Sequence, residues 1–290
     1  MAKDKMDISI IVPLYKGQKY VLSIQKMVAQ NVVFANERGK KLEVELIFVN
    51  DYPDEAIVVN TEVQRYKVFV IANNDNCGIH QTRVNGLKRS RGEYVLFLDQ
   101  DDEITPNCLF SQYSVIGDKD MVVGNGYRGI NGDYRKIYRS VKKQQLVCRE
   151  MIFLKAANQI VSPGHCLIRR SAIHPAWCNN IMKENGGDDL FLWLLMFEND
   201  KKFCINHECV YRHVDTGVNF SSNLLAMYRS SDNLIKIAEE TGALKQNTIN
   251  IYRRRINYLK AIYETSGILR IVLTIKNLDI LIAKIYAYYR

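Results

Sequence analysis

The sequence contains little of what would mark a fibrous, secreted or membrane-spanning protein. Its 290 residues include only 5 prolines and 16 glycines, which excludes a collagen-like chain and leaves no long flexible linker. No segment has the ~20 consecutive apolar residues of a membrane span, and the apolar run at residues 8–12 is too short for a signal-peptide core. The seven cysteines are odd in number and form no Cys-x-x-Cys pair. We therefore expect reduced thiols and a cytoplasmic protein.

The overall composition is that of a globular protein. Hydrophobic residues make up 47% of the chain and charged residues 24%, which excludes wholesale disorder. A chain of this length can bury a core without disulfides and suits one large domain, or one domain with an appendage.

Positive charge is concentrated at the C-terminal end. The whole chain has 40 Lys and Arg against 31 Asp and Glu, a net +9, and residues 250–290 hold eight basic and two acidic residues, a net +6. The rest is close to neutral, so we expect no nucleic-acid partner. Six tyrosines lie within the basic segment. A basic, tyrosine-rich segment suits an anionic membrane surface.

The first hundred residues alternate between two kinds of segment. Four short runs rich in β-branched residues predict buried strands at residues 8–12, 44–49, 68–72 and 94–98. The segments between them predict helices at residues 18–31, 54–65 and 79–91. This alternation is typical of a doubly wound, mostly parallel α/β sheet.

Beyond residue 102 the pattern is looser. Strands are predicted at 121–127, 134–138, 203–205 and 210–213, and helices at 146–158 and 188–198. From residue 223 the pattern is helical, with breaks near Gly242 and Gly267. We expect an α/β domain over residues 1–215 and a helical C-terminal region over residues 216–290.

Polar residues follow three of the predicted strands directly. The first strand ends in Pro13, Leu14 and Tyr15, the second in Asn50 and Asp51, and the fourth in the run 99–102. Ligands of open α/β sheets bind at the carboxyl ends of the strands, so one crevice should receive all three groups.

The run 99–102 contains three aspartates. In an extended chain Asp99 and Asp101 would share one face, with Asp102 on the other. Two carboxylates on one face favour a hard divalent cation such as Mg²⁺ or Mn²⁺. The alternative is that these aspartates cap the helix expected after Thr105 and Pro106.

Four segments resemble the family 2 glycosyltransferases: residues 10–15, the run Phe-Val-Asn-Asp at 48–51, residues 76–86 and residues 92–102. The similarity resumes at residues 187–196 and 211–213. It implies the GT-A fold and an inverting transfer of sugar from a nucleotide-sugar donor, with Mn²⁺ or Mg²⁺ as cofactor. Bacterial members of this type act in surface polysaccharide synthesis, on saccharide or lipid-linked acceptors at the inner face of the membrane.

The resemblance also implies roles for single residues. Asp51 would read the nucleotide base, Asp99 and Asp101 would hold the ribose and the metal-bound diphosphate, and Arg83 would brace the nucleotide. The alternative for Arg83 is a solvated helix arginine. His213 would complete the metal shell or contact the diphosphate, or else is a hydrogen-bonded structural histidine. Further contacts to the nucleotide-sugar are expected from Pro13, Tyr15, Gln100 and Asp188.

Three positions depart from the family pattern. Asn50 stands where Asp is also common, Tyr52 and Pro53 replace the usual Gly-Ser, and Lys16 stands where Asn is frequent. All of them surround the expected base and first loop, so they bear on the identity of the nucleotide.

The segment Gly187–Leu194 resembles the family's helix start that carries the catalytic base. Matched residue by residue, Asp189 would be the general base and Asp188 takes the place of the usual Glu. A carboxylate has a pKa near ~4, so it serves as a base through position and partial desolvation. The alternative is that both acids only complement the helix dipole.

The last segment has an apolar stripe at helical spacing. Its positions are 268, 271, 272, 275, 278, 282 and 285. Lys276 and Lys284 lie off the stripe, and Asp279 falls near it. The stripe predicts an interfacial helix on an anionic membrane, a helix packed on the catalytic domain, or a contact in a homo-oligomer.

We therefore expect an enzyme that adds one sugar per encounter, with UDP as the expected nucleotide. The alternative is a non-catalytic scaffold of the same fold that binds partners or membrane through its basic tail. A nucleotidyltransferase would need a Gly-rich loop after the first strand, which is absent.

Overall fold

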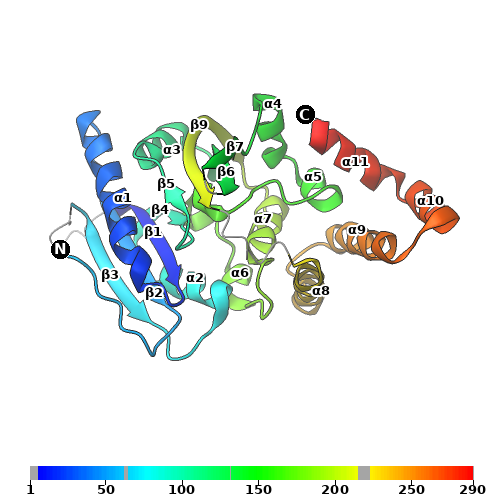
Figure 1. Ribbon diagram of the computed structural model, residues 1–290, viewed down its shortest axis with the longest axis horizontal. Coiled ribbons are helices and arrows are strands. Elements are labelled where there is room, and N and C mark those ends of the chain that lie inside the picture. Colours follow the sequence, from blue (N-terminus) through cyan, green and yellow to red (C-terminus); the bar gives the residue numbers. More distant parts are fainter. Residues whose placement is uncertain (1–5, 62–64, 131, 215–222, 290) are drawn as a thin grey trace. The chain divides into compact units, whose positions relative to one another are not determined.

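The computed structural model describes residues 6–61, 65–130, 132–214 and 223–289 (Figure 1). Contacts divide the chain into two compact units, each made of several segments. The first contains Met1–Tyr138, Val161–Ile173 and Lys201–Gly217, and the second contains Arg139–Ile160, His174–Asp200 and Val218–Arg290. The domain boundary predicted at residue 215 falls outside the described residues and stays a prediction.

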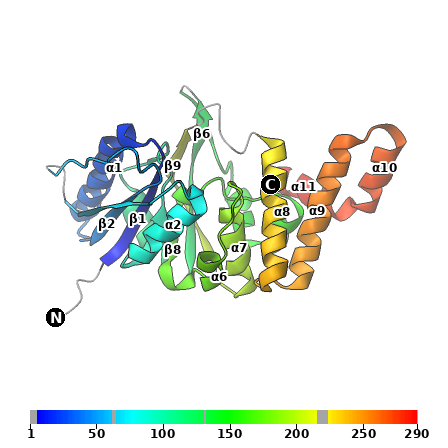
Figure 2. The ribbon, with the colours of Figure 1, turned by 90° about the horizontal axis from the view of Figure 1, so that it is seen from below.

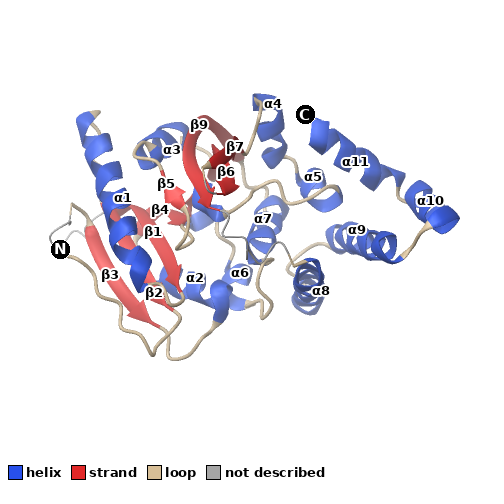
Figure 3. Cartoon of the chain, in the orientation of Figure 1, coloured by secondary structure: helices blue, strands red, loops and turns tan. Residues whose placement is uncertain are grey.

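The first unit is built on a mixed sheet (Figure 3). Its first four strands are β1 (Met6–Leu14), β2 (Val44–Asn50), β3 (Lys67–Ala72) and β4 (Gly92–Phe97). They are parallel and lie in the order β3-β2-β1-β4. The order reverses between β1 and β4, and ligands of such sheets bind at this reversal. All four predicted strands, and the predicted fold class, are confirmed, but the prediction that the third strand is buried is wrong, since β3 lies at the edge of the sheet and its residues are half-buried or exposed.

Five further strands extend the sheet beyond β4. They are β5 (Glu103–Ile104), β6 (Met121–Ile130), β7 (Asp133–Lys136), β8 (Cys166–Arg169) and β9 (Phe203–Val214). The two short strands predicted at 203–205 and 210–213 form the single strand β9. A register shift opposite Asn125 lets β9 continue beside β6 without a break.

Helices pack on both faces of the parallel strands. Helices α1 (Gln18–Glu37) and α3 (Cys108–Ile116) share a core cluster with alternate residues of β1, including Ile8 and Ile10. Helix α2 (Gly78–Arg89) packs on the opposite face, where Gly86 lies against Ile11 and Val49. The side chains of β1 contact helices on both faces of the sheet because successive side chains of a strand point to opposite faces.

The helix predicted at residues 54–65 is wrong: residues 54–61 form no helix, and residues 62–64 lie outside the described part. Side chains of α1 take the backbone groups that a helix would use. Gln18 exchanges two hydrogen bonds with the backbone of Val58, and Gln25 does the same with Asn60. Such competition for backbone groups overrides local helix propensity.

The second unit is helical throughout its described residues. Its helices are α4 (Val141–Gln144), η1 (Gln145–Cys148), α5 (Glu150–Lys155), α6 (Pro175–Asn179), α7 (Asp188–Glu198), α8 (Leu224–Thr241), α9 (Gln246–Glu264), α10 (Gly267–Lys276) and α11 (Leu278–Tyr289). The helix predicted at 146–158 is therefore two shorter ones, η1 and α5. The breaks fall as predicted, at Gly242, with φ of 62°, and at Gly267, with φ of 59°. Helices α8 and α9 lie side by side (Figure 2).

None of the helices in the described part of the chain has both the length and the hydrophobicity that a membrane span requires.

We predict that Gly86→Val lowers the free energy of unfolding by about 1–3 kcal/mol. A Cβ at this position would collide with Cγ2 of Ile11 and lie 3.0 Å from Cγ2 of Val49. Urea denaturation measures the effect. Lys88→Val on the exposed side of the same helix is the control, with an expected loss below about 1 kcal/mol. Equal losses in the two variants would contradict a close approach of α2 to the sheet.

Candidate active site

Asp51 follows β2 and is held by the N-terminus of α2. It is buried, and its carboxylate accepts hydrogen bonds from the backbone N–H groups of Cys77 (2.8 Å) and Gly78 (2.9 Å) and from Nδ2 of Asn73 (2.8 Å). A carboxylate has about four acceptor positions. Three are filled from these partners, which leaves one for a donor on a ligand.

Asn73 is a residue that the sequence analysis missed. It follows β3 directly, as Asp51 follows β2, and this shared position was the available signal. Besides Asp51 it contacts Oγ1 of Thr82 (3.0 Å) and accepts from Nδ2 of Asn85 (2.8 Å). These bonds tie the end of β3 to α2.

Gln100 connects the loop after β4 to the end of β1. Its Oε1 accepts from the backbone N–H of Tyr15 (2.9 Å), and its Nε2 donates to the carbonyl of Tyr15 (3.2 Å). The amide therefore fixes the position of Tyr15. Pro13, two residues before Tyr15, is buried within β1 and pairs with Val49 of β2.

Two of the residues that depart from the family pattern, Tyr52 and Lys16, lie beside Tyr15. The rings of Tyr15 and Tyr52 meet edge to face with centroids 5.5 Å apart, and Nζ of Lys16 lies 5.0 Å from the Tyr52 centroid. Lys16 has a φ of 50°, which non-glycine residues rarely adopt. Two rings and a cation thus form one patch at the carboxyl ends of β1 and β2.

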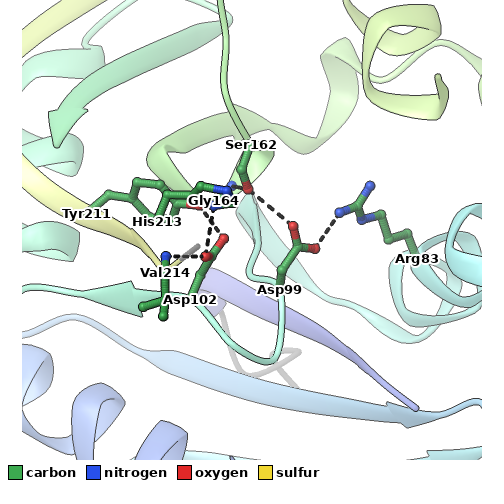
Figure 4. A network of polar contacts seen from close by, with 8 residues as sticks. All are labelled: Arg83, Asp99, Asp102, Ser162, Gly164, Tyr211, His213 and Val214. Atoms are coloured by element: carbon green, nitrogen blue, oxygen red, sulfur yellow. Dashed lines mark hydrogen bonds and ion pairs between the residues drawn. The ribbon is translucent and has the colours of Figure 1, made fainter. Parts of the chain in front are cut away.

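Asp99 lies between two partners from different segments (Figure 4). Nη2 of Arg83 donates to its Oδ1 at 2.5 Å, and Oγ of Ser162 donates to its Oδ2 at 3.3 Å. The Arg83 side chain is only 6% exposed. The interpretation of Arg83 as a solvated helix residue is therefore wrong, because the buried guanidinium pairs with Asp99. Ser162 was not predicted, and no local pattern marks it.

The chain turns directly after Asp99 instead of continuing as a strand. The backbone N–H of Asp102 donates to the carbonyl of Asp99 (3.1 Å), which closes the turn. The premise of an extended run 99–102 is therefore wrong. The capping alternative is also wrong, since helix α3 begins after Asn107 and no side chain caps it. Burial, with Asp102 and Asp99 nearby, raises the pKa of Asp101.

Asp102 is buried and connects this turn to strand β9 (Figure 4). Its Oδ2 accepts from the hydroxyl of Tyr211, and its Oδ1 accepts from Nδ1 of His213 (3.0 Å) and the N–H of Val214 (3.2 Å). Burial raises the pKa of Asp102. Burial alone would lower the pKa of His213, but the bond to Asp102 outweighs it and the pKa is raised.

The predicted metal ligands do not form a cluster in the described part of the chain. No three His, Cys, Asp or Glu side chains there gather closely enough to hold a metal ion. Of the predicted set, Asp99 pairs with Arg83 and His213 with Asp102, while Asp101 has an ion pair with no described residue. The hydrogen bond to Asp102 agrees with the structural interpretation of His213.

Asp188 and Asp189 begin helix α7 of the second unit. Oδ2 of Asp189 accepts from Nδ2 of Asn158 (2.9 Å), and Oδ1 accepts from the N–H of Leu190 (2.6 Å). Asp188 is buried, and its carbonyl accepts from Nε1 of Trp177 (2.9 Å). The Asp189 carboxylate is thus fixed by an amide side chain and by the first turn of its own helix.

The comparison with protein families shows which family the chain belongs to. The sequence profile described as glycosyl transferase family 2 matches residues 9–175. The chain belongs to glycosyl transferase family 2. The match contains Asp51, Arg83 and the run 99–102, and the predicted family and class of enzyme are confirmed.

Known family 2 proteins resemble this one over parts of their length. Minor teichoic acid biosynthesis protein GgaB of Bacillus subtilis (strain 168) is 34% identical over 103 residues, 34% of this chain and 11% of that protein. Poly(ribitol-phosphate) beta-N-acetylglucosaminyltransferase TarP of Staphylococcus aureus (strain N315) is 26% identical over 142 residues, 46% of this chain and 40% of TarP. The chain thus spans less than half of either relative.

A solved structure supports the fold over nearly the whole chain. Residues 1–349 of S. aureus TarS, in complex with UDP-GlcNAc, align with a TM-score of 0.59 and 16% identity. The alignment covers 96% of this chain and 81% of that one. This similarity confirms the predicted GT-A fold.

A buried histidine behind Tyr211 predicts a dependence of stability on pH. His165 is fully buried, its ring stacks on Tyr211 with centroids 5.2 Å apart, and its Nδ1 bonds the carbonyl of Gly124 (2.8 Å). Burial lowers its pKa to about 4. Between pH ~6.5 and pH ~4, His165 is therefore protonated in the unfolded chain but neutral in the folded chain.

Above pH ~6.5 this histidine should not reduce the free energy of unfolding. As the pH falls from there towards ~4, the free energy of unfolding should decrease by roughly 3 kcal/mol because of this residue. His165→Gln should remove that part of the slope in urea denaturation across this range. His207→Gln, at an exposed histidine, is the control and should leave the slope unchanged. An unchanged slope in His165→Gln would show that another group causes the acid loss.

Proposed function

We propose that the protein moves one sugar from a UDP-sugar to a hydroxyl of a saccharide or lipid-linked acceptor in surface polysaccharide synthesis, with inversion and with a divalent cation. One observation carries the proposal: in a family 2 chain, Asp51, Asp99 and Asp101 follow β2 and β4 at the carboxyl edge of one sheet. Ligands of this sheet type bind at that edge.

The nucleotide is the part of the donor that the site supports best. Asp51 retains an acceptor position for the imide N–H of a uracil base, and the patch of Tyr15, Tyr52 and Lys16 offers aromatic surface to a planar ring. Asp99, oriented by Arg83, would accept from ribose hydroxyls. TarS, which shares the fold, has been solved with UDP-GlcNAc, and this favours UDP as the first nucleotide to test.

The side chains after β4 fit a hard divalent cation by their donor chemistry. Asp101 offers carboxylate oxygens and lies near two other acids that raise its pKa, so a cation beside it would be favoured. Asp101 would hold the ion, since Asp99 and His213 are engaged with Arg83 and Asp102. Bound Mn²⁺ or Mg²⁺ would neutralise negative charge on the departing diphosphate.

The transfer itself requires a base. The acceptor oxygen forms a bond to the anomeric carbon while the bond from that carbon to the diphosphate oxygen breaks, and the nucleoside diphosphate leaves. We assign the acceptor's proton to Asp189. Asn158 and the N–H of Leu190 hold this carboxylate in a fixed orientation, which a positioned base needs.

The printed names of the relatives support the class of acceptor. GgaB is named for minor teichoic acid biosynthesis and TarP for transfer to poly(ribitol-phosphate). A polyol phosphate or a saccharide presents the hydroxyl that the reaction consumes, so a surface polymer is the acceptor we propose.

Calorimetric titration with UDP tests the donor site. We expect binding that depends on Mn²⁺, and Asp101→Ala should weaken the metal-dependent part at least about tenfold, about 1.4 kcal/mol. Asp118→Ala is the control, because Asp118 is an exposed acid paired only with Lys119 among the described residues. Failure of UDP to bind with metal present would refute UDP as the nucleotide. Titrations with dTDP, GDP and CDP would then separate a different donor from a scaffold without donor binding.

The role of Asp189 is tested by removing its charge while keeping its shape. Asp189→Asn should lower the rate of transfer by about 10²–10⁴-fold, because the amide cannot take a proton, with UDP affinity unchanged within about twofold. The rate is measured by release of UDP from the donor in the presence of acceptor. Asp200→Asn makes the same change at an exposed position after the same helix and should keep the rate. Retained transfer in Asp189→Asn would exclude Asp189 as the base.

A further inference from the structure

The last two helices expose an apolar surface that no described residue covers. It consists of Ile268, Ile271, Val272, Ile275, Leu278, Ile282, Ile285 and Tyr289, and is called here the C-terminal apolar surface. These side chains are between 41% and 81% exposed. None of the ten residues of α10 is buried, and all ten are described. Exposed apolar patches of this kind mark interaction sites in proteins.

The spacing shows that each helix presents one face. On α10 four of the five exposed large apolar residues follow the pattern i, i+3, i+4, i+7 from Ile268, and on α11 four of the five follow i, i+4, i+7, i+11 from Leu278; Leu269 and Tyr288 lie off these patterns. Both patterns describe a single stripe along a helix. All seven positions of the predicted stripe are on this surface.

The two helices are anchored by their other sides. Ile280 and Ala287 of α11 are buried, and Ala287 packs against Leu146 and Ile152. Thr274 of α10 accepts a hydrogen bond from the hydroxyl of Tyr258 at 3.4 Å. The exposed stripe is therefore held in place by packing within the second unit, and does not need to fold on binding.

Asp279, the acid that falls near the stripe in the sequence, points towards cations. Its Oδ2 forms ion pairs with Nζ of Lys155 (2.7 Å) and with Arg254. The hydrogen bond from Lys155, supported by Arg254, lowers the pKa of Asp279 below its usual value. No other acidic residue lies between residues 265 and 289. Apart from Asp279, the charged side chains of α10 and α11 are Arg270, Lys276 and Lys284, all of them basic.

We propose that the C-terminal apolar surface binds the surface of an anionic lipid bilayer. Apolar side chains would enter the boundary of the acyl region while Arg270, Lys276 and Lys284 contact the lipid headgroups. Tyr288 and Tyr289, both about 80% exposed, carry the amphipathic rings that favour this boundary. An acceptor carried on a lipid would meet the enzyme there.

The charge around the surface favours lipid over a second copy of the chain. A symmetric dimer brings the same patch of both subunits together, so it would gather two sets of these three cations at one interface. No free acid on α10 or α11 is available to compensate them. An anionic bilayer supplies the opposite charge.

Co-sedimentation with vesicles tests the proposal without donor or acceptor, and so independently of the proposed transfer. We expect the protein to bind vesicles of phosphatidylcholine with phosphatidylglycerol more strongly than vesicles of phosphatidylcholine alone. Binding should weaken with salt, since the Debye length falls from about 10 Å at 0.1 M to about 3 Å at 1 M. Ile271→Glu with Ile275→Glu should lower the partition coefficient at least about tenfold.

The matched control places the same two charges on exposed apolar positions elsewhere. Leu22→Glu with Val115→Glu, on α1 and α3, should bind vesicles as the unchanged protein does. Circular dichroism establishes that each variant is folded. The proposal is overturned if the unchanged protein stays in the supernatant with anionic vesicles, or if the Ile271 and Ile275 variant still binds. It is also overturned if light scattering shows an oligomer that the same variant converts to monomer.

Discussion

Repulsion among three neighbouring carboxylates is the constraint around which the first unit's site is arranged. Asp99, Asp101 and Asp102 lie within one turn, and two of the three have a basic partner from a different element. Arg83 of α2 pairs with Asp99, and His213 of β9 pairs with Asp102. Since like charges this close cannot all stay ionised without compensation, the positions of α2 and β9 and the charge state of the turn depend on one another.

Asp101 is the member of this group that has no ion pair with a described residue. Burial and the neighbouring acids both raise the pKa of Asp101, so ionising this carboxylate costs more free energy than it would in water. A cation from solution would relieve this repulsion in the way that Arg83 and His213 already do for the other two. In the proposed function a divalent ion beside Asp101 would have this effect.

Neutral amides, in contrast, hold the loops at the carboxyl edge of the sheet. Gln100 binds the backbone of Tyr15, Asn73 binds Asp51, and Asn50 accepts from the N–H of Tyr52 and donates to the carbonyl of Glu55. Amides can donate and accept at once, so each closes a loop without adding charge. These three amides thereby hold the loops at this edge without forming ion pairs.

The parts of the fold that could be predicted are those determined by local pattern. Buried β-branched runs predicted β1 to β4, and the glycines at 242 and 267 predicted the breaks between helices. The segment 54–61 could not be predicted, because its backbone is satisfied by Gln18 and Gln25, which are distant in sequence. The turn after Asp99 could not be predicted for a similar reason. In this turn Asp102 forms hydrogen bonds with Tyr211 and His213 of β9, more than a hundred residues later in the chain.

The distribution of charge on the C-terminal helices could likewise be predicted only in part from the sequence. The sequence assigns residues 250–290 a net +6, but a sum over the chain does not show which cations are neutralised. Arg253 pairs with Glu239, Lys260 with Asp232, and Arg254 with Asp279, so much of the positive charge of α9 is compensated within the second unit. Arg270, Lys276 and Lys284 pair with no described residue. The cations without an ion-pair partner among the described residues thus lie on the two helices whose apolar stripe is exposed, and this supports the proposal that these helices bind a lipid surface.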